Sequence, residues 1–465
     1  MIKDLPNKQY DILSKYAAAV AETDSIKLTG RVERIVGNRI EALGPPARQG
    51  DICRIRLDKN DFLSAQVVGI NKELIILMPL GNIEGLRPGA EVQILSSAFA
   101  APVGKKLLGR IISGTGEPMD GRGRIYAEAW YPYNGTPVNP LHRTSVDTPL
   151  SVGVRAIDGL NTVGRGQRIG IFAGSGVGKS TLIGMIARYT DADINVIALI
   201  GERGREVRDF IDKELGPDGL ERSVVIIATS DMPAMARIRG SYLAHAIAEY
   251  FRDQGLAVNL LMDSVTRFAM AQREIGLAAG EPAATRGYPP SVYSLLPKLM
   301  ERAGTSDTGG SITGFYAVLV EGDDMDEPIA DAARSILDGH IVLSRQLAHR
   351  NHYPAIDVLA SVSRCMKDVV TQEHSAAAAE FRRLLASYAD VEDLINLNAY
   401  SRGSNPTADK AIAFRDDMEA FLCQEIGERE TYSSIVTRLE EMFVPKKQGI
   451  TADAIRQPSF ATIVR

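Results

Sequence analysis

The chain contains little cysteine and no long apolar run. Its three cysteines, Cys53, Cys365 and Cys423, lie too far apart in the 465 residues for a disulfide framework or a metal-spaced pair, so we expect each to be a buried small side chain. No stretch approaches the apolar length of a membrane span, and the first residues, MIKDLPNKQYD, lack the apolar region of a secretion signal. These absences favour a protein of the reducing cytosol.

The chain also lacks an excess of positive charge. It has 53 Lys and Arg against 58 Asp and Glu, a net charge of −5, which argues against a general binder of polyanions such as nucleic acids. Its apolar content of 45% is that of an ordinary globular protein. A chain of this length is too long for a single core, so we expect two or three domains.

Three regions with different patterns follow a short N-terminal tail. Residues 25–97 consist of short alternating runs separated by turns, which predict a small β-barrel without an aromatic stacking face for nucleic acid. Residues 98–375 carry an α/β pattern, and residues 376–440 have helical periodicity. The tail, 1–24, is typical of either a frayed terminus or a partner-binding helix, and we expect residues 441–465 to be irregular.

The α/β region predicts a mainly parallel sheet covered by helices on both faces. Helical stretches such as 236–252 alternate with apolar runs, which are 194–201, 223–229, 257–263 and 315–321. Ligands in such folds bind beyond the carboxyl ends of the strands.

The C-terminal region predicts two helices with a break between them. Helical spacing covers 376–388 and 414–426, and a Gly-Ser-Asn-Pro sequence at 403–406 separates them.

The most informative stretch is AGSGVGKST at 173–181, directly after an apolar run. Its glycines let several backbone N–H groups converge on an anion at the start of a helix, which is the design of a phosphate-binding loop. Ala173 stands where the general pattern has glycine, and its methyl group is tolerable if the residue has ordinary β conformation. We predict that the nucleotide is bound by Gly174, Ser175, Gly176, Val177, Gly178, Lys179, Ser180 and Thr181.

Three further residues are candidates for the chemistry of a nucleotide phosphate. Asp263 ends an apolar strand, where it would hold Mg²⁺ or else cap a helix. Glu202 ends another, where it would orient an attacking water or else be a solvated charge in a turn. Arg364 would neutralise the transferring phosphoryl group of a neighbouring subunit, or else be structural.

These strings together resemble the rotary ATPase superfamily. The similarity runs from about residue 25 to 440 and includes GER at 201–203, LLMDSVTRFAMAQREIG at 260–276 and PAIDVLASVSR at 354–364. The best match is the flagellar and type III secretion export ATPase branch, in which alanine at the position of Ala173 is usual. The resemblance implies a RecA-like, mainly parallel sheet core with an N-terminal β-barrel and a C-terminal helical domain.

The resemblance also implies a role for each site residue. Lys179 and Ser180 would bind phosphate and Mg²⁺, and Asp263 would lie on the Mg²⁺ side. Glu202 would be the catalytic glutamate, with Arg203 as the arginine beside it.

Two residues would act at the edges of the site. Arg364 matches the arginine finger that a neighbouring subunit receives, and Tyr353 matches an aromatic residue that packs on adenine. In mixed rings of this superfamily the non-catalytic subunit lacks the glutamate, so a chain holding both Glu202 and Arg364 can complete a ring of identical subunits. We therefore expect a homohexamer with active sites between subunits.

The function implied is Mg²⁺-dependent ATP hydrolysis that energises protein export, with the flagellar apparatus favoured over a virulence secretion system by residues 40–55. Implied partners are a stator-like regulator at the N-terminal segment, a central-stalk protein, export chaperones with cargo, and the membrane export gate. The protein would be cytoplasmic and peripheral at the inner face of the cell membrane. The loop at 276–290 would face the centre of the ring and contact the stalk, or else be a plain surface loop.

Three alternatives stay open from the sequence. A catalytic subunit of a rotary ATP synthase or ion pump would share the catalytic residues. A hexameric RNA helicase would share the core, although the acidic balance and the absent aromatic face argue against it. A non-catalytic nucleotide-binding subunit is the third alternative, and Glu202 argues against it.

Overall fold

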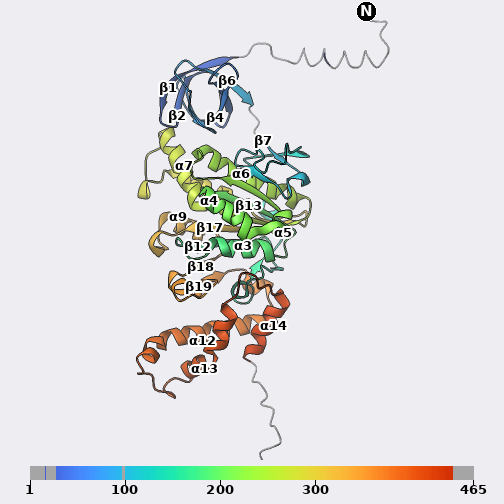
Figure 1. The fold of residues 1–465 in the computed structure, drawn as a ribbon, viewed down its shortest axis with the longest axis vertical. Coiled ribbons are helices and arrows are strands. Elements are labelled where there is room, and N and C mark those ends of the chain that lie inside the picture. The colour runs from blue at the N-terminus through green and yellow to red at the C-terminus, as the bar shows by residue number, and fades with distance from the viewer. Residues whose placement is uncertain (1–15, 17–27, 97–99, 444–465) are drawn as a thin grey trace, which may run out of the picture.

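The computed structural model describes Tyr16, residues 28–96 and residues 100–443. A β-barrel, a helix-covered sheet and a group of helices are stacked along the long axis of the molecule (Figure 1). This arrangement confirms the predicted fold class. The predicted tail at 1–24, apart from Tyr16, and most of the predicted irregular tail at 441–465 lie outside the described residues.

The N-terminal barrel is closed by six strands in the order β1-β2-β5-β4-β3-β6. Alternate residues of β4, Leu63, Ala65 and Val67, are buried inside it, as the period of two requires. The strands are β1 (Thr29–Val36), β2 (Arg39–Leu43), β3 (Ile52–Arg56), β4 (Phe62–Asn71), β5 (Leu74–Pro79) and β6 (Glu91–Ser96).

The central sheet has the order β19-β18-β12-β17-β15-β13-β14-β8, with the short β16 paired to β17. All pairs are parallel except β18–β19 and β16–β17. The strands are β8 (Ile111–Ser113), β12 (Arg168–Ala173), β13 (Ile194–Ile200), β14 (Ser223–Ala228), β15 (Ala257–Asp263), β16 (Gly304–Thr305), β17 (Ser311–Leu319), β18 (Gly339–Leu343) and β19 (Ile356–Ser363).

Two hydrophobic cores lie on the two faces of this sheet. Along β13, Val196 and Ala198 belong to one core, and Ile197 and Leu199 belong to the other. The covering helices are α3 (Lys179–Tyr189), α4 (Gly204–Asp209), α5 (Gly216–Glu221), α6 (Ala234–Asp253), α7 (Val265–Ala279), α8 (Pro290–Met300), α9 (Pro328–Ile336) and α10 (Arg345–His349), with a π-helical turn, η3 (Phe210–Leu215), between α4 and α5. The β-strand runs and the helix at 236–252 are therefore where the sequence predicts them.

Smaller elements connect the three parts. They are the strands β7 (Ala100–Val103), β9 (Ala129–Pro132), β10 (Pro149–Leu150) and β11 (Val163–Gly164), the helices α2 (Arg155–Asp158) and α11 (Met366–Val369), and the 3₁₀ turns η1 (Lys105–Leu107), η2 (Pro140–His142), η4 (Thr285–Gly287) and η5 (Glu321–Asp323).

The C-terminal helices are α12 (Gln372–Asn396), α13 (Pro406–Leu422) and α14 (Tyr432–Met442). The prediction of helix through residue 426 is wrong, because α13 ends at Leu422 and Cys423 is extended. The Gln424 N–H instead donates to the Tyr353 carbonyl over 2.9 Å. No helix among the described residues is long and apolar enough to cross a membrane.

Two other expectations need correction. The loop predicted at 276–290 is shorter, because α7 continues to Ala279, and Gly280 ends it in the left-handed conformation at φ 95°. Cys53 is buried as expected, but Cys365 and Cys423 are only partly buried.

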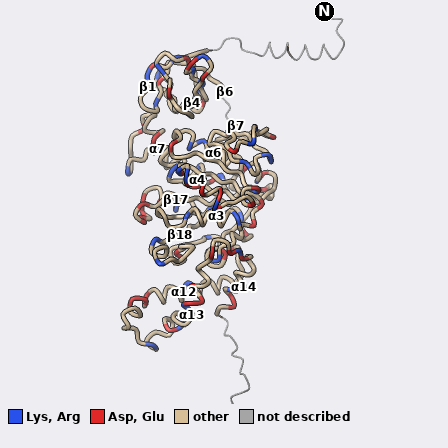
Figure 2. The backbone as a smooth tube through the Cα atoms, in the orientation of Figure 1, with Lys and Arg blue, Asp and Glu red and all other residues tan. Residues whose placement is uncertain are grey.

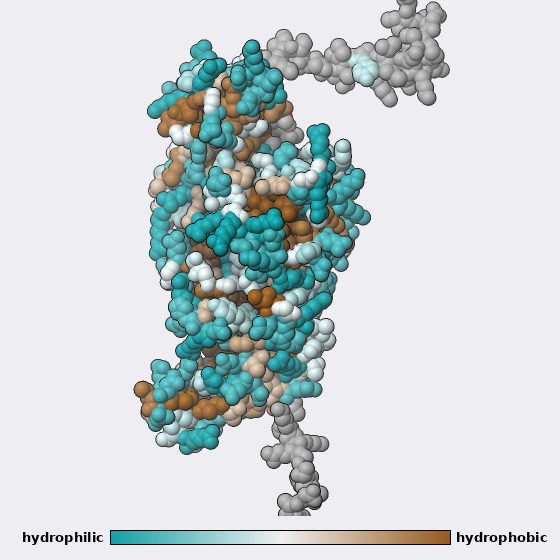
Figure 3. Space-filling model, viewed as in Figure 1, coloured by the Kyte–Doolittle hydropathy of each residue, from teal (hydrophilic) through white to brown (hydrophobic). Residues whose placement is uncertain are grey.

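The surface combines charges of both signs with a few apolar areas. Lys and Arg alternate with Asp and Glu along the barrel, the sheet and the C-terminal helices (Figure 2). An apolar area covers the end of the α12–α13 hairpin (Figure 3), where Leu394 and Leu397 are 45% and 75% exposed.

Candidate functional site

The phosphate-binding loop has the geometry that its sequence predicts. Ala173 is the last residue of β12, paired between Leu319 and Leu343, so its methyl group lies in regular strand backbone. Gly176 and Gly178 have φ of 79° and 95°, a conformation that L side chains rarely adopt. The helix α3 starts at Lys179, so the loop N–H groups and the helix N-terminus form an anion cradle.

Gly174 lies against the ends of two charged side chains. Its φ is not positive, but a Cβ built there would lie 2.7 Å from Arg345 Nη2 and 2.8 Å from Asp323 Oδ1. The space beside this residue is therefore already taken by two charged side chains.

The Lys179 ammonium group lies between the side chains of Asp263 and Glu202, where the parallel strands end. Its ammonium group donates to Asp263 Oδ1 and lies 3.4 Å from Glu202 Oε1. The side chains of Lys179, Asp263 and Glu202 are 10%, 5% and 16% exposed, respectively. They come from α3 and from the ends of the neighbouring strands β15 and β13, so the predicted convergence is observed.

Burial and mutual charge set the protonation of this group. Burial lowers the pKa of Lys179, but the negative charges of Asp263 and Glu202 outweigh it, and the net direction is upward. Burial raises the pKa of Glu202 to about 7, the charge of Asp263 adds to this, and Lys179 opposes it. A carboxylate whose pKa lies near neutrality is suited to accept a proton from a reacting water.

Asp263 does not cap the helix that follows it. The cap of α7 is Ser264, whose Oγ accepts a hydrogen bond from the Arg267 N–H over 3.4 Å. The Asp263 side chain points instead to Lys179, so it is available for a cation beside the phosphate loop.

The donor set at this edge fits a magnesium ion held partly by phosphate and water. Within residues 28–96 and 100–443, no group of three or more His, Cys, Asp or Glu side chains is arranged to hold a metal ion. Mg²⁺ in phosphoryl-transfer sites takes one or two protein oxygens and keeps several waters. The exposed Ser180 hydroxyl and the Asp263 carboxylate can supply those oxygens.

A cavity of about 560 Å³ adjoins the phosphate loop on the side of α3. Tyr353, 42% exposed, stands on its wall, and a Cβ added to Gly178 would lie 3.6 Å from the Tyr353 ring. The segment 423–428 forms another wall. The predicted base-binding aromatic residue is therefore next to the phosphate loop. Thr181 also lines this cavity, but its hydroxyl donates to Glu214 over 3.0 Å.

Arg364 lies at the opposite edge of the sheet. Its N–H donates to the Asp338 carbonyl over 3.0 Å, just before β18. The phosphate loop follows the neighbouring parallel strand β12, beside the far end of β18, where Ala173 pairs with Leu343. Asp338 and Leu343 are about 17 Å apart at the rise of a strand, farther than an arginine side chain reaches. The exposed Arg364 side chain makes no hydrogen bond or ion pair to any other described residue.

Arg203 points away from the site. Its side chain is 80% exposed and lies 3.5 Å from Glu206 Oε1 in the first turn of α4. Within this chain the structure therefore brings together Glu202, Lys179 and Asp263, and leaves both Arg203 and Arg364 outside that group.

Sequence reasoning missed three contributors. The Glu206 side chain raises the pKa of Glu202 further through a hydrogen bond, after the larger effects of burial and of Asp263. Arg267 packs on Gly201, where a Cβ would lie 2.7 Å from the Arg267 Cβ. The segment 423–428 is hidden in the sequence because helical periodicity continues to 426.

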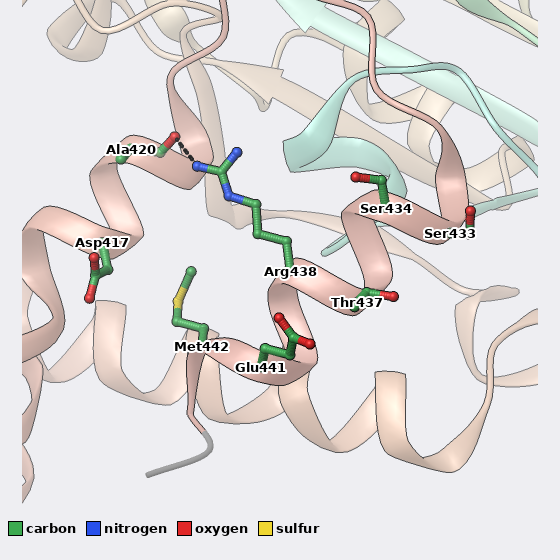
Figure 4. Close-up of a pocket in the computed structure, with 8 residues that line it drawn as sticks. All are labelled: Asp417, Ala420, Ser433, Ser434, Thr437, Arg438, Glu441 and Met442. Carbon is green, nitrogen blue, oxygen red and sulfur yellow. Dashed lines mark hydrogen bonds between the residues drawn. The ribbon is translucent and has the colours of Figure 1, made fainter. Parts of the chain in front are cut away.

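A second cavity, of about 580 Å³, lies between α13 and α14 (Figure 4). Arg438 crosses it and donates to the Ala420 carbonyl over 3.2 Å. None of the predicted site residues lines it, so we place no chemistry there.

Models of known families match most of the chain. The ATP synthase alpha/beta family nucleotide-binding domain matches residues 153–363, and the beta-barrel domain of that family matches residues 32–95. The C-terminal domain of the EscN ATPase of type III secretion matches residues 370–441.

Individual relatives match over nearly their full length. A flagellum-specific ATP synthase of Treponema pallidum is 53% identical over 92% of this chain and 96% of its own. A type 3 secretion system ATPase of Xanthomonas euvesicatoria is 50% identical over 88% of this chain and 93% of its own.

Two solved structures share the fold. The assembled ATPase EscN of the enteropathogenic E. coli type III secretion system superposes with a TM-score of 0.85 at 47% identity, covering 89% of this chain and 99% of EscN. EscN in complex with its central stalk EscO gives 0.82 at 46% identity, with the same coverage.

Proposed function

Because the chain belongs to the ATP synthase alpha/beta family, and within it to the ATPases of flagellar and type III protein export, we propose that it energises protein export as a Mg²⁺-dependent ring of identical subunits. Its similarity to these ATPases extends over nearly their full length and identifies it as an ATP hydrolase. The observation that carries the proposal is Lys179 between Glu202 and Asp263, directly after a phosphate cradle.

Each residue of the group then has a separate task. The cradle and Lys179 bind the β- and γ-phosphates, and Ser180 and Asp263 hold Mg²⁺, which supplies positive charge to the phosphate oxygens. Glu202 orients the water that attacks the γ-phosphate and accepts its proton. Water attacks directly, so no covalent intermediate forms.

The position of Arg364 supports a site shared between subunits. Because it lies at the edge of the sheet opposite the phosphate loop, it serves the site of a neighbour. Head-to-tail contacts of this kind close into rings, and we propose a homohexamer. Arg203, which points outward, would also lie near the neighbouring subunit.

The remaining partners are proposed from the family. EscN forms a complex with its central stalk EscO, and we assign the corresponding contact in this chain to the loop between α7 and α8. Export chaperones with cargo would dock on the exposed leucines at the end of the α12–α13 hairpin. A stator-like regulator would bind the N-terminal segment, and the export gate would hold the ring at the inner face of the cell membrane. No nucleic acid partner is proposed.

The flagellar system remains our preferred setting. Relatives of both kinds, flagellum-specific and type 3 secretion, match at similar identity. The preference therefore depends on residues 40–55, and deletion of the gene should abolish flagellar assembly if it is right.

The first experiment is ATP turnover per subunit measured against protein concentration, with Lys179→Ala as the blank. Specific activity should rise steeply with concentration, because each site needs a neighbour. If specific activity did not change with concentration while size-exclusion chromatography showed a monomer, the shared site would be contradicted. Complete absence of turnover would favour the non-catalytic subunit.

A further inference from the structure

An ion pair between Arg345 and Asp323, separate from the group of Lys179, Glu202 and Asp263, lies against the phosphate loop. Arg345 begins α10, and its Nε lies 3.3 Å from Asp323 Oδ2 of η5. Both side chains occupy the space where Gly174 would carry a Cβ. Gly174 itself is buried, so the pair closes the outer side of the loop at its second residue.

Asp323 lies at a position of unusual backbone conformation. Its φ is 61°, in the left-handed region that few residues other than glycine, asparagine and aspartate adopt. This backbone conformation and the ion pair with Arg345 together place the Asp323 carboxylate beside Gly174.

The same turn is tied to the loop between α7 and α8. Arg286 of that loop donates to Asp324 Oδ2 over 3.3 Å. Residues 280–288 and the phosphate loop thus contact neighbouring residues of one turn, 321–327.

We propose that Arg345 is a positioning residue of the phosphate loop, and that the Asp323–Asp324 turn transmits displacement of residues 280–288 to that loop. The inference rests on the proposed function only in assigning ATP to the loop. A partner that moves residues 280–288 would shift Asp324, then Asp323 and Arg345, and so change the fit of the cradle to phosphate. The pairs are half exposed, so each effect is modest and reversible.

Steady-state kinetics tests the first half of the proposal. Arg345→Gln and Asp323→Asn should each raise the KM for MgATP about fivefold, the scale of a partly exposed ion pair, with a smaller change in kcat. The exchanged pair, Asp323→Arg with Arg345→Asp, should recover part of the loss. Arg334→Gln is the matched control, because Arg334 pairs with Asp326 of the same acidic region over 3.3 Å without approaching Gly174. A KM that is unchanged in both single variants would overturn the positioning role.

Amide hydrogen exchange tests the second half without requiring turnover. Arg286→Gln and Asp324→Asn should speed exchange at residues 173–178 as well as at 280–288, whereas Arg334→Gln should not. Faster exchange at 280–288 alone would overturn the transmission. Because exchange does not depend on hydrolysis, a protein that failed to hydrolyse ATP would refute the proposed function and leave this result readable.

Discussion

Lys179 neutralises two carboxylates that would otherwise repel each other in a buried site. Asp263 and Glu202 each lie within reach of its ammonium group, and Asp263 is the closer. When phosphate enters the cradle and attracts Lys179, both carboxylates lose part of their counter-charge. One can then bind a cation and the other a proton, which is the division of labour that ATP hydrolysis requires.

The pKa of Glu202 gives a pH dependence with a definite sign. If Glu202 accepts the proton of the attacking water, as we propose, its carboxylate form is the active one. Its pKa is raised to about 7, so kcat/KM should reach a plateau above neutral pH and fall about tenfold per pH unit below it. Glu206→Gln removes one of the causes that raise this pKa, so the falling limb should move to lower pH. A limb that stays in place in Glu206→Gln would show that another group controls it.

Part of the site could be predicted from single residues and part could not. Lys179, Glu202 and Asp263 each follow an apolar strand at a carboxyl end, and the topology of a parallel sheet places such ends together. Asp323 and Arg345 follow no comparable pattern, because the contact proposed for them depends on a left-handed turn far from the loop in the sequence.

At the scale of elements, the strand β12 explains why alanine replaces the first glycine of the loop. Ala173 is 1% exposed and paired on both sides, so it belongs to the sheet and not to the cradle. Ala173→Gly should therefore lower the unfolding free energy by about 0.5–1 kcal/mol and leave the KM for MgATP unchanged. Urea denaturation and steady-state kinetics measure the two effects. A tenfold change in KM would place Ala173 in the cradle after all.

The small helix α2 fastens the C-terminal helices to the core. Arg155 is 2% exposed, donates to the Phe421 carbonyl over 2.9 Å and pairs with Glu430 over 2.5 Å and with Glu428. Arg155→Met should cost about 3–5 kcal/mol, because it leaves buried acceptors without a donor. Arg438→Gln, which also loses a contact with Glu430 but is 41% exposed, is the control and should cost less than about 1 kcal/mol. Equal midpoints for the two variants in urea denaturation would refute this fastening role.

The end of α13 shows where element prediction fails. Periodicity alone continues the helix to residue 426, but hydrogen bonds from Gln424 to Tyr353 and Gly153 stop it four residues earlier. These partners are distant in sequence, and no local pattern encodes them. As a result, residues 423–428 form a wall of the cavity beside Tyr353, where we propose the base binds.

On the scale of the whole molecule, the sheet separates the phosphate cradle from the arginine that we propose serves a neighbouring subunit. The cradle and Glu202 lie at the carboxyl ends of its parallel strands. Arg364 lies at the opposite ends, and its side chain makes no hydrogen bond or ion pair to another described residue. Under the proposed function, a single chain would hold one half of each of two sites. Identical chains that meet head to tail would complete every site with the same pair of surfaces.

Mixing two inactive variants tests this arrangement directly. Arg364→Ala should retain nucleotide binding but lose about 10³-fold or more in turnover, and Lys179→Ala should lose hydrolysis as well. In a random equal mixture, about a quarter of the interfaces join an intact cradle to an intact finger, so turnover should recover toward a quarter of the wild-type value.

The controls for the mixing experiment are each variant alone and a second mixture. In that mixture, Arg364→Ala is combined with a double variant carrying both Glu202→Gln and Arg364→Ala, so that no interface has an arginine finger. Sizing must show that mixed rings form. If Arg364 acted within its own chain, no mixed interface would be complete, and turnover would stay at the level of the separate variants. Recovery in the first mixture and none in the second can arise only if one subunit supplies the arginine and its neighbour supplies the cradle.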